Sequence, residues 1–308
     1  YKKTFERTLK DMSKTEENLS SGKKFLRPSD DPIGVSRSLR LNTDVANMAQ
    51  FKRNAEDAAS WLDTTEMAMN NIIDVLQRAR ELTVQAASGT NSPDERNATA
   101  TEISQLKEQL VNIANTNYAG SYIFSGFKTN QAPLASDGKY SFDPASPLKS
   151  TEQIQFNVGI GDRMTINFTA QKIFGVMTNT SGVDDPINPS PTVSNTNTPQ
   201  MIEVFNRLID DLQNGKTTEI NNALGRLDIQ LNNANAVRAE IGVKSNRLDL
   251  TINRIDDDSI NLQDLLSKNE DADIAEVIMN LKMKENVYKA SLSGGANIIQ
   301  PSLIDFLR

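Results

Sequence analysis

Residues 217–266 read TTEINNALGRLDIQLNNANAVRAEIGVKSNRLDLTINRIDDDSINLQDLL, one of the two longest helical patterns in the chain. Apolar residues recur in it at alternating steps of four and three, the spacing of a seam along which one helix packs on another. The seam consists of Ile220, Leu224, Leu227, Leu231, Ala234, Ile241, Leu248, Ile252, Ile255, Leu262 and Leu266, with Arg238, Ser245 and Ser259 at its weaker positions. At about 1.5 Å of rise per residue, such a helix would span roughly 75 Å. The stretch therefore predicts a rod.

A second long helical pattern runs from Pro32 to about Ser88 with the same spacing. Its seam comprises Leu62, Thr65, Met69, Ile72, Leu76, Ala79, Thr83 and Ala86. Gly89 ends this pattern, and the segment 92–95 (Ser-Pro-Asp-Glu) predicts a new helix start. Serine can cap there, proline suits the first turn, and glutamate can close a capping box. The helix that follows, to about Asn117, is expected to lie antiparallel to the one before it.

The middle of the chain, from about Tyr118 to Gly175, changes from a helical to an alternating pattern. The two alternating runs are Ile154, Phe156 and Val158, and then Met164, Ile166 and Phe168. Residues 159–162 predict a hairpin loop between them, and Asp137-Gly138 predicts another turn. Residues 178–199 are polar and rich in proline, which favours a linker, before a helix that stops at Asn214-Gly215. We therefore predict a mainly α fold: a long antiparallel helical bundle or coiled coil formed by the N- and C-terminal segments, with a small β-rich insertion.

Each end of the chain carries a narrow apolar seam of its own. These residues are Phe5, Leu9, Met12 and Leu19 at the first end, and Ile274, Ile278, Leu281, Tyr288, Leu292, Ile299 and Phe306 at the last. Since no other folded body is left to cover them, we expect the two terminal helices to pack together and to form an assembly interface with neighbouring subunits. Two thin stripes stabilise little, so we expect these ends to be loose in the isolated subunit and ordered by its neighbours.

A connector separates the first seam from the second helix. Pro28 and Pro32 cannot both lie inside a helix, so the segment from Lys23 to Pro32 is expected to be irregular. Its candidate functional residues are Arg27, Pro28, Asp30, Asp31 and Pro32. Asp30 and Asp31 are also a candidate carboxylate pair for acid–base chemistry, but no base, nucleophile or pocket pattern accompanies them. We favour capping of the helix that begins at Pro32.

The composition excludes most hydrolase and zinc-enzyme designs, while carboxylate or lysine chemistry stays open. The 308 residues include no cysteine and no histidine, which removes thiol nucleophiles, disulfides, and the commonest general base and metal ligand. Gly215-Lys216-Thr217 fails as a phosphate-binding loop because Asp210 stands where the first glycine belongs. We therefore expect no catalytic residue, no metal and no cofactor.

The net charge and the hydropathy of the sequence limit the kinds of partner that the chain can bind. A net charge of −7 argues against nucleic acid or an anionic membrane as the main partner. No apolar run approaches the roughly 20 residues that cross a bilayer. The chain opens with Tyr1-Lys2-Lys3 and continues into a charged helix, so a cleavable secretory signal is not expected.

Several segments resemble the bacterial flagellin superfamily. Residues 19–24 followed by 27–32 are similar to the N-terminal signature that flagellins share with the hook-associated protein 3 family, and Pro32, where flagellins usually have alanine, favours that family. The segments 122–129 and 300–307 also resemble hook-associated protein 3. Flagellin-like segments are 238–242, 246–248 and 271–276. The resemblance covers roughly residues 15–130 and 200–308.

The resemblance implies a structural subunit of the bacterial flagellum that leaves the cell unfolded through the flagellar type III apparatus. Such a subunit would bind hook-associated protein 1 on the hook side and flagellin on the filament side, form a ring of its own copies, and meet an export chaperone. Residues 1–40 and 267–308 would form a terminal coiled-coil domain in the inner tube. Residues 41–130 and 198–266 would form a helical bundle, and 131–197 the β-rich insertion and linker.

Two alternatives stay open at this point. A minor flagellin would polymerise into long filaments on reconstitution, whereas a junction subunit would stop at short rings. A coiled-coil surface adhesin would use the β-rich insertion as its binding head and would bind vesicles or glycans without flagellar partners.

Overall fold

The computed structural model describes residues 2–88, 92–142, 152–176 and 197–299. Phe306, Gly89 and most of the predicted linker at 178–199 lie outside the described residues. The chain divides into a terminal unit, made of the residues up to Gln50 and from Ile255 onward, and a central unit, Phe51–Arg254.

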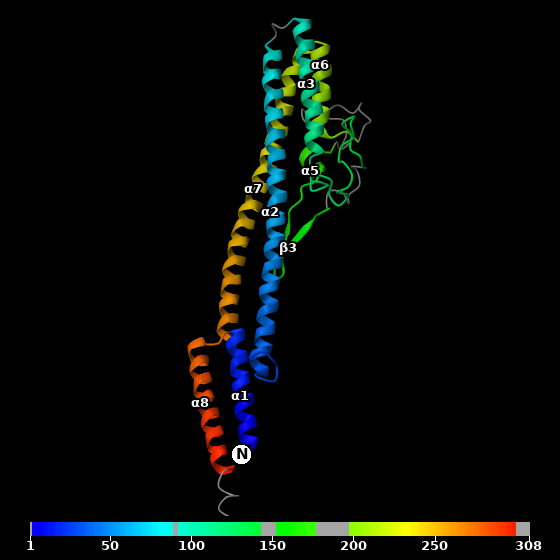
Figure 1. Cartoon of the computed structure of the whole chain (residues 1–308). Coiled ribbons are helices and arrows are strands. Elements are labelled where there is room, and N and C mark those ends of the chain that lie inside the picture. Colours follow the sequence, from blue (N-terminus) through cyan, green and yellow to red (C-terminus); the bar gives the residue numbers. More distant parts are fainter. Residues whose placement is uncertain (1, 89–91, 143–151, 177–196, 300–308) are drawn as a thin grey trace, which may run out of the picture. The chain divides into compact units, whose positions relative to one another are not determined.

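Long helices dominate the chain (Figure 1). The helices are α1 Lys2–Ser21, α2 Pro32–Ala87, α3 Pro93–Ala114, α5 Ala170–Phe174, α6 Gln200–Gln213, α7 Thr217–Glu270 and α8 Ile274–Ile299. The strands are β1 Asn117–Tyr118, β2 Ser121–Tyr122, β3 Gln155–Gly159 and β4 Asp162–Thr165. Long N- and C-terminal helical segments with small two-stranded sheets in the middle confirm the predicted fold class.

The predicted seam of α2 forms much of the central core. Leu62, Met69 and Ile72 are fully buried, and so are the two threonines of the seam, Thr65 and Thr83. Each threonine hydroxyl donates to the carbonyl four residues earlier, at 2.8 Å for Thr65 and 2.7 Å for Thr83. Because the hydroxyls are satisfied within the helix, these positions can be buried without an unpaired polar group.

The predicted start of α3 is confirmed in detail. The Ser92 hydroxyl accepts from the Glu95 amide at 3.3 Å, and the Ser92 amide donates to the Glu95 carboxylate at 2.7 Å. This capping box satisfies two amides that the first turn leaves without helical partners. The helix ends at Ala114 rather than near Asn117, because Asn117 begins β1. Within the central unit α3 packs along α6 (Figure 1).

The predicted hairpin lies at β3–β4. The strands are antiparallel, with Phe156 opposite Met164, and Gly159 and Asp162 close the turn. Gly161 has a φ of +75°, a left-handed conformation that glycine adopts without strain. The turn at Asp137-Gly138 is also confirmed, since Leu134 and Tyr140 form a bridge across it. The sequence patterns did not predict α5, β1 or β2.

Candidate functional site

The two terminal helices pack against each other inside the terminal unit (Figure 1). Phe5 of α1 stacks on Tyr288 of α8, with ring centroids 5.3 Å apart. The Lys284 ammonium donates to the Thr15 hydroxyl at 2.6 Å and to the Asp11 carbonyl at 3.0 Å. Since residues later in α1 meet residues earlier in α8, the pair is antiparallel, and each helix covers one edge of the other.

This mutual cover is incomplete. The predicted residues of α1, Phe5, Leu9, Met12 and Leu19, are all half-buried, as are Leu281 and Tyr288 of α8. By contrast, Ile274, Ile278 and Leu292 remain 43%, 44% and 48% exposed. The Ile299 side chain and Phe306 lie outside the described part of the chain. The pair therefore leaves apolar side chains of α8 in contact with water.

The structure adds a second apolar stripe on α8 that we did not predict. Met279, Met283 and Val287 recur every four residues and are 59%, 56% and 50% exposed. Their four-residue spacing is visible in the sequence, but the predicted seam, which begins at Ile274, Ile278 and Leu281, runs along a different face of α8. A helix that is apolar on more than one face is normally buried by several neighbours.

The connector is held by two ion pairs to α1. Arg27 pairs with Glu17 at 2.9 Å, and Asp30 pairs with Lys14 at 2.8 Å. The hydrogen bond from Lys14 holds the pKa of Asp30 below its usual value. Pro28 is exposed, and Pro32 is the first residue of α2.

Asp31 caps α2, as predicted for this acidic pair. Its carboxylate accepts from the amides of Ile33 at 3.1 Å and Gly34 at 3.0 Å. Gly34 is itself buried, and a Cβ at this position would lie 2.7 Å from the Phe25 ring. The absence of a side chain therefore allows the connector to fold back closely on the first turn of α2.

Glu270, at the end of α7, closes the connector from the other side. Its carboxylate accepts from the Lys23 ammonium at 2.6 Å and from the Asn42 amide at 3.3 Å, and its carbonyl accepts from the Lys24 amide at 2.6 Å. Burial would raise the pKa of Glu270, but hydrogen bonds from Lys23 and Ser38 and the charge of Lys23 outweigh it and lower the pKa. No sequence signal joined Glu270 to Lys23, since most of the chain lies between them.

The segment that partly resembles a phosphate-binding loop, Gly215-Lys216-Thr217, has a structural role. Gly215 ends α6 with a φ of +66°, and Lys216 pairs with Asp210 at 2.6 Å. Within the described ranges, no set of acidic side chains is grouped so that it could hold a metal ion. None of the helices in those ranges combines the length and hydropathy of a membrane span.

Comparisons with known proteins agree over both ends of the chain. The family model of the bacterial flagellin N-terminal helical region matches residues 1–129, and that of the C-terminal helical region matches residues 224–307. Flagellar hook-associated protein 3 of Escherichia coli (strain K12) is 31% identical over 287 residues, which cover 89% of this chain and 87% of that protein.

Two further proteins extend the comparison. Flagellin FlaB2 of Treponema pallidum (strain Nichols) is 27% identical over 310 residues, covering 99% of this chain and 96% of that protein. The solved structure of a flagellar hook-associated protein from Vibrio parahaemolyticus aligns with a TM-score of 0.64 at 22% identity. The alignment covers 79% of this chain and 100% of that one, and it shows the same fold.

Proposed function

The chain belongs to the flagellar hook-associated protein 3 family of the bacterial flagellin superfamily, and from this premise we propose that it joins the flagellar hook to the filament. As a member of this family it is a structural protein of the bacterial flagellum and not an enzyme. In the proposal it binds hook-associated protein 1 on one side and flagellin on the other, in a ring of its own copies outside the cell. An export chaperone accompanies it before secretion.

One observation carries the proposed mode of assembly: α8 keeps two apolar faces in water. Ile274, Ile278 and Leu292 border the side that meets α1, and Met279, Met283 and Val287 form the second stripe. Completing the burial of one such side chain contributes about 1 kcal/mol, and the gain is repeated at every subunit. Neighbouring copies that cover these faces would therefore stabilise the terminal helices and the ring together.

The proposed roles of the domains follow from this mode of assembly, in which the terminal helices contact neighbouring copies. Residues 1–40 and 267–308 form the terminal coiled-coil domain through which subunits polymerise. Residues 41–130 and 198–266 form a helical bundle, and residues 131–197 are the β-rich insertion and linker. The connector residues Arg27, Pro28, Asp30, Asp31 and Pro32 orient the polymerising domain, an assignment supported by their ion pairs and by the Asp31 cap.

A minor flagellin is the second candidate, because the similarity to flagellin FlaB2 spans 99% of the chain. The two functions predict different assemblies when the purified chain is reconstituted. Mixed with hook-associated protein 1 and flagellin, a junction subunit caps hooks and nucleates flagellin filaments. A flagellin instead extends into long filaments of its own.

Complementation of a bacterium that lacks this gene tests the proposal. The null strain should shed unpolymerised flagellin into the medium, and the wild-type chain should restore filaments. A variant with Met279→Ser, Met283→Ser and Val287→Ser should fail to restore them. The matched control replaces two exposed apolar residues of the central unit, Met67→Ser and Val84→Ser, and should restore them fully. Normal filaments in the null strain would contradict the junction role.

A further inference from the structure

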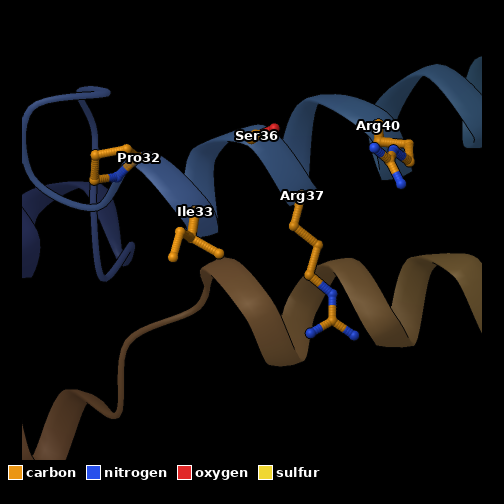
Figure 2. Close-up of a pocket in the computed structure, with 5 residues that line it drawn as sticks. All are labelled: Pro32, Ile33, Ser36, Arg37 and Arg40. Carbon is orange, nitrogen blue, oxygen red and sulfur yellow. The ribbon is translucent and has the colours of Figure 1, made fainter.

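The first turns of α2 present an apolar and basic face to solvent. Pro32, Ile33, Ser36, Arg37 and Arg40 line a groove of ≈ 500 Å³ on the terminal unit, and Figure 2 shows these side chains along the helix. Ile33 is 82% exposed. Within the described part of the chain, neither Arg37 nor Arg40 has an ion-pair partner, so both guanidinium groups can bind an acidic surface.

The helical register explains why this face is uncovered. Gly34, Ser38 and Leu41 point into the terminal unit and are buried. Ile33, Arg37 and Arg40 follow a parallel stripe on one flank of that buried face, at steps of four and three residues. The way α2 packs therefore leaves Ile33, Arg37 and Arg40 exposed, and these side chains do not contribute to the core of the terminal unit.

A second stripe, acidic and apolar, lies on α7 within the same unit. Asp257, Ile260 and Asp264 recur at steps of three and four, and Ile260 is 64% exposed. This stripe lies on the opposite side of α7 from buried Ile255. Asp257 has no ion-pair partner among the described residues. Asp264 pairs with Lys268 at 2.6 Å, but both side chains are exposed, and such a pair contributes little and is readily exchanged.

The two stripes have the same length and opposite charges. Each spans eight residues of helix, or about 10 Å from the first Cα to the last. One carries two arginines and an isoleucine, and the other carries two aspartates and an isoleucine. Laid side by side in either direction, they place Arg40 opposite one aspartate and Arg37 beside Ile260, between the two carboxylates, while Ile33 lies beside the other aspartate. Arginine suits this position because its stem covers apolar surface while its head binds carboxylates.

We propose that the Ile33–Arg37–Arg40 face of one subunit docks on the Asp257–Ile260–Asp264 face of a second copy. The inference rests on the proposed ring of copies and names a contact that holds it. Because the two faces are different patches of the same unit, the contact is heterologous. Such a contact repeats from copy to copy and generates a ring when the rotation closes.

Disulfide trapping in flagella tests the contact, since the chain has no cysteine of its own. Two full-length variants carry Arg40→Cys with either Asp257→Cys or Asp264→Cys, which covers both directions of packing. The matched control carries Leu39→Cys with Asp257→Cys, because Leu39 is 64% exposed on the other flank of α2. After mild oxidation of isolated flagella, one of the two test variants should give a ladder of covalent dimers and larger species. The control should stay monomeric.

Charge reversal supplies an independent readout. Arg37→Glu with Arg40→Glu should lower the amount of this chain retained on isolated flagella, and adding Asp257→Arg with Asp264→Arg should restore it. No ladder and no restoration, in flagella that contain the chain and carry filaments, would overturn this contact and leave the junction role intact. Absence of the wild-type chain from isolated flagella would instead overturn the proposed function.

Discussion

Phe5 and Tyr288 stack with their ring centroids 5.3 Å apart, although they stand near opposite ends of the chain. This pair is the aromatic contact of the α1–α8 packing, and the Lys284 ammonium adds two hydrogen bonds beside it. Packing of the terminal unit therefore depends on a few side chains, and their removal has measurable consequences.

Tyr288→Ala should loosen α1 as well as α8. An aromatic pair contributes about 0.5–1.5 kcal/mol beyond its buried area, so amide exchange in Lys2–Ser21 should rise by at least about fivefold. Tyr288→Phe keeps the stacked ring and is the control, because its exchange rates should equal those of the wild type. Unchanged exchange in Tyr288→Ala would show that the stacking does not hold the helices together.

The terminal helices should be the least protected helices of the isolated subunit. Their seam side chains are half-buried or exposed, whereas the seams of α2 and α7 in the central unit include fully buried residues. Hydrogen exchange on the free chain should be faster in α1 and α8 than in α3 and α6, and should slow in assembled flagella. Strong protection of Ile274–Ile299 in the free chain would contradict this expectation.

Glu270→Gln should destabilise the chain at neutral pH by about 1–3 kcal/mol, because a hydrogen-bonded charge is lost at a buried site. The folded-state pKa of Glu270 is lowered, so its contribution is present above the unfolded-state value of about 4.3 and is lost as pH falls through the folded-state value. Thermal unfolding at pH 7 and pH 3 should therefore show a difference from the wild type that shrinks in acid.

The control for that experiment is Glu276→Gln on α8, whose exposed carboxylate has no hydrogen bond or ion pair among the described residues. It should change stability by less than about 0.5 kcal/mol at either pH. An equal loss in both variants would mean that the contacts of Glu270 are not stabilising.

Gly34→Ala should destabilise the terminal unit by about 1–3 kcal/mol, since the new methyl group would push against the Phe25 ring and the Asp31 carboxylate that caps α2. Gly225→Ala is the matched helical control. No atom lies within 4 Å of a Cβ built at Gly225, so this change should stabilise α7 by about 0.5–1 kcal/mol. Urea unfolding of both variants measures the difference. A neutral Gly34→Ala would contradict the tight fit of the connector.

Removing all residues after Lys284 should leave a soluble, helical chain that cannot support filament growth. The truncation deletes Tyr288 and half of α8 but leaves the central unit intact. Circular dichroism should show most of the helical signal retained, while a strain carrying only this form should shed flagellin. Normal motility in that strain would defeat the junction assignment.

The long helices and their buried faces were predictable because their patterns extend over many turns. The Thr65 and Thr83 positions of the α2 seam and the Ser92–Glu95 capping box were read correctly from spacing alone. The five-residue helix α5 was missed, since so short a segment shows no period.

The candidate site was predicted less completely. The two ends were expected to meet, and they do. Spacing does not tell which side of α8 the first helix covers, so Met279, Met283 and Val287 were overlooked. The Glu270–Lys23 contact depends on the chain returning to its own beginning, and nothing local to either residue indicates it.

The pairing of α1 with α8 also determines the order in which parts of the chain can fold. The helices α2 and α3 follow each other in the chain and can form early, whereas α1 must wait for the last helix before it finds its partner. Because a chain is made from its N-terminal end, α1 appears first and stays unpaired until α8 is present. The paired ends therefore mark a chain whose last helix is already present.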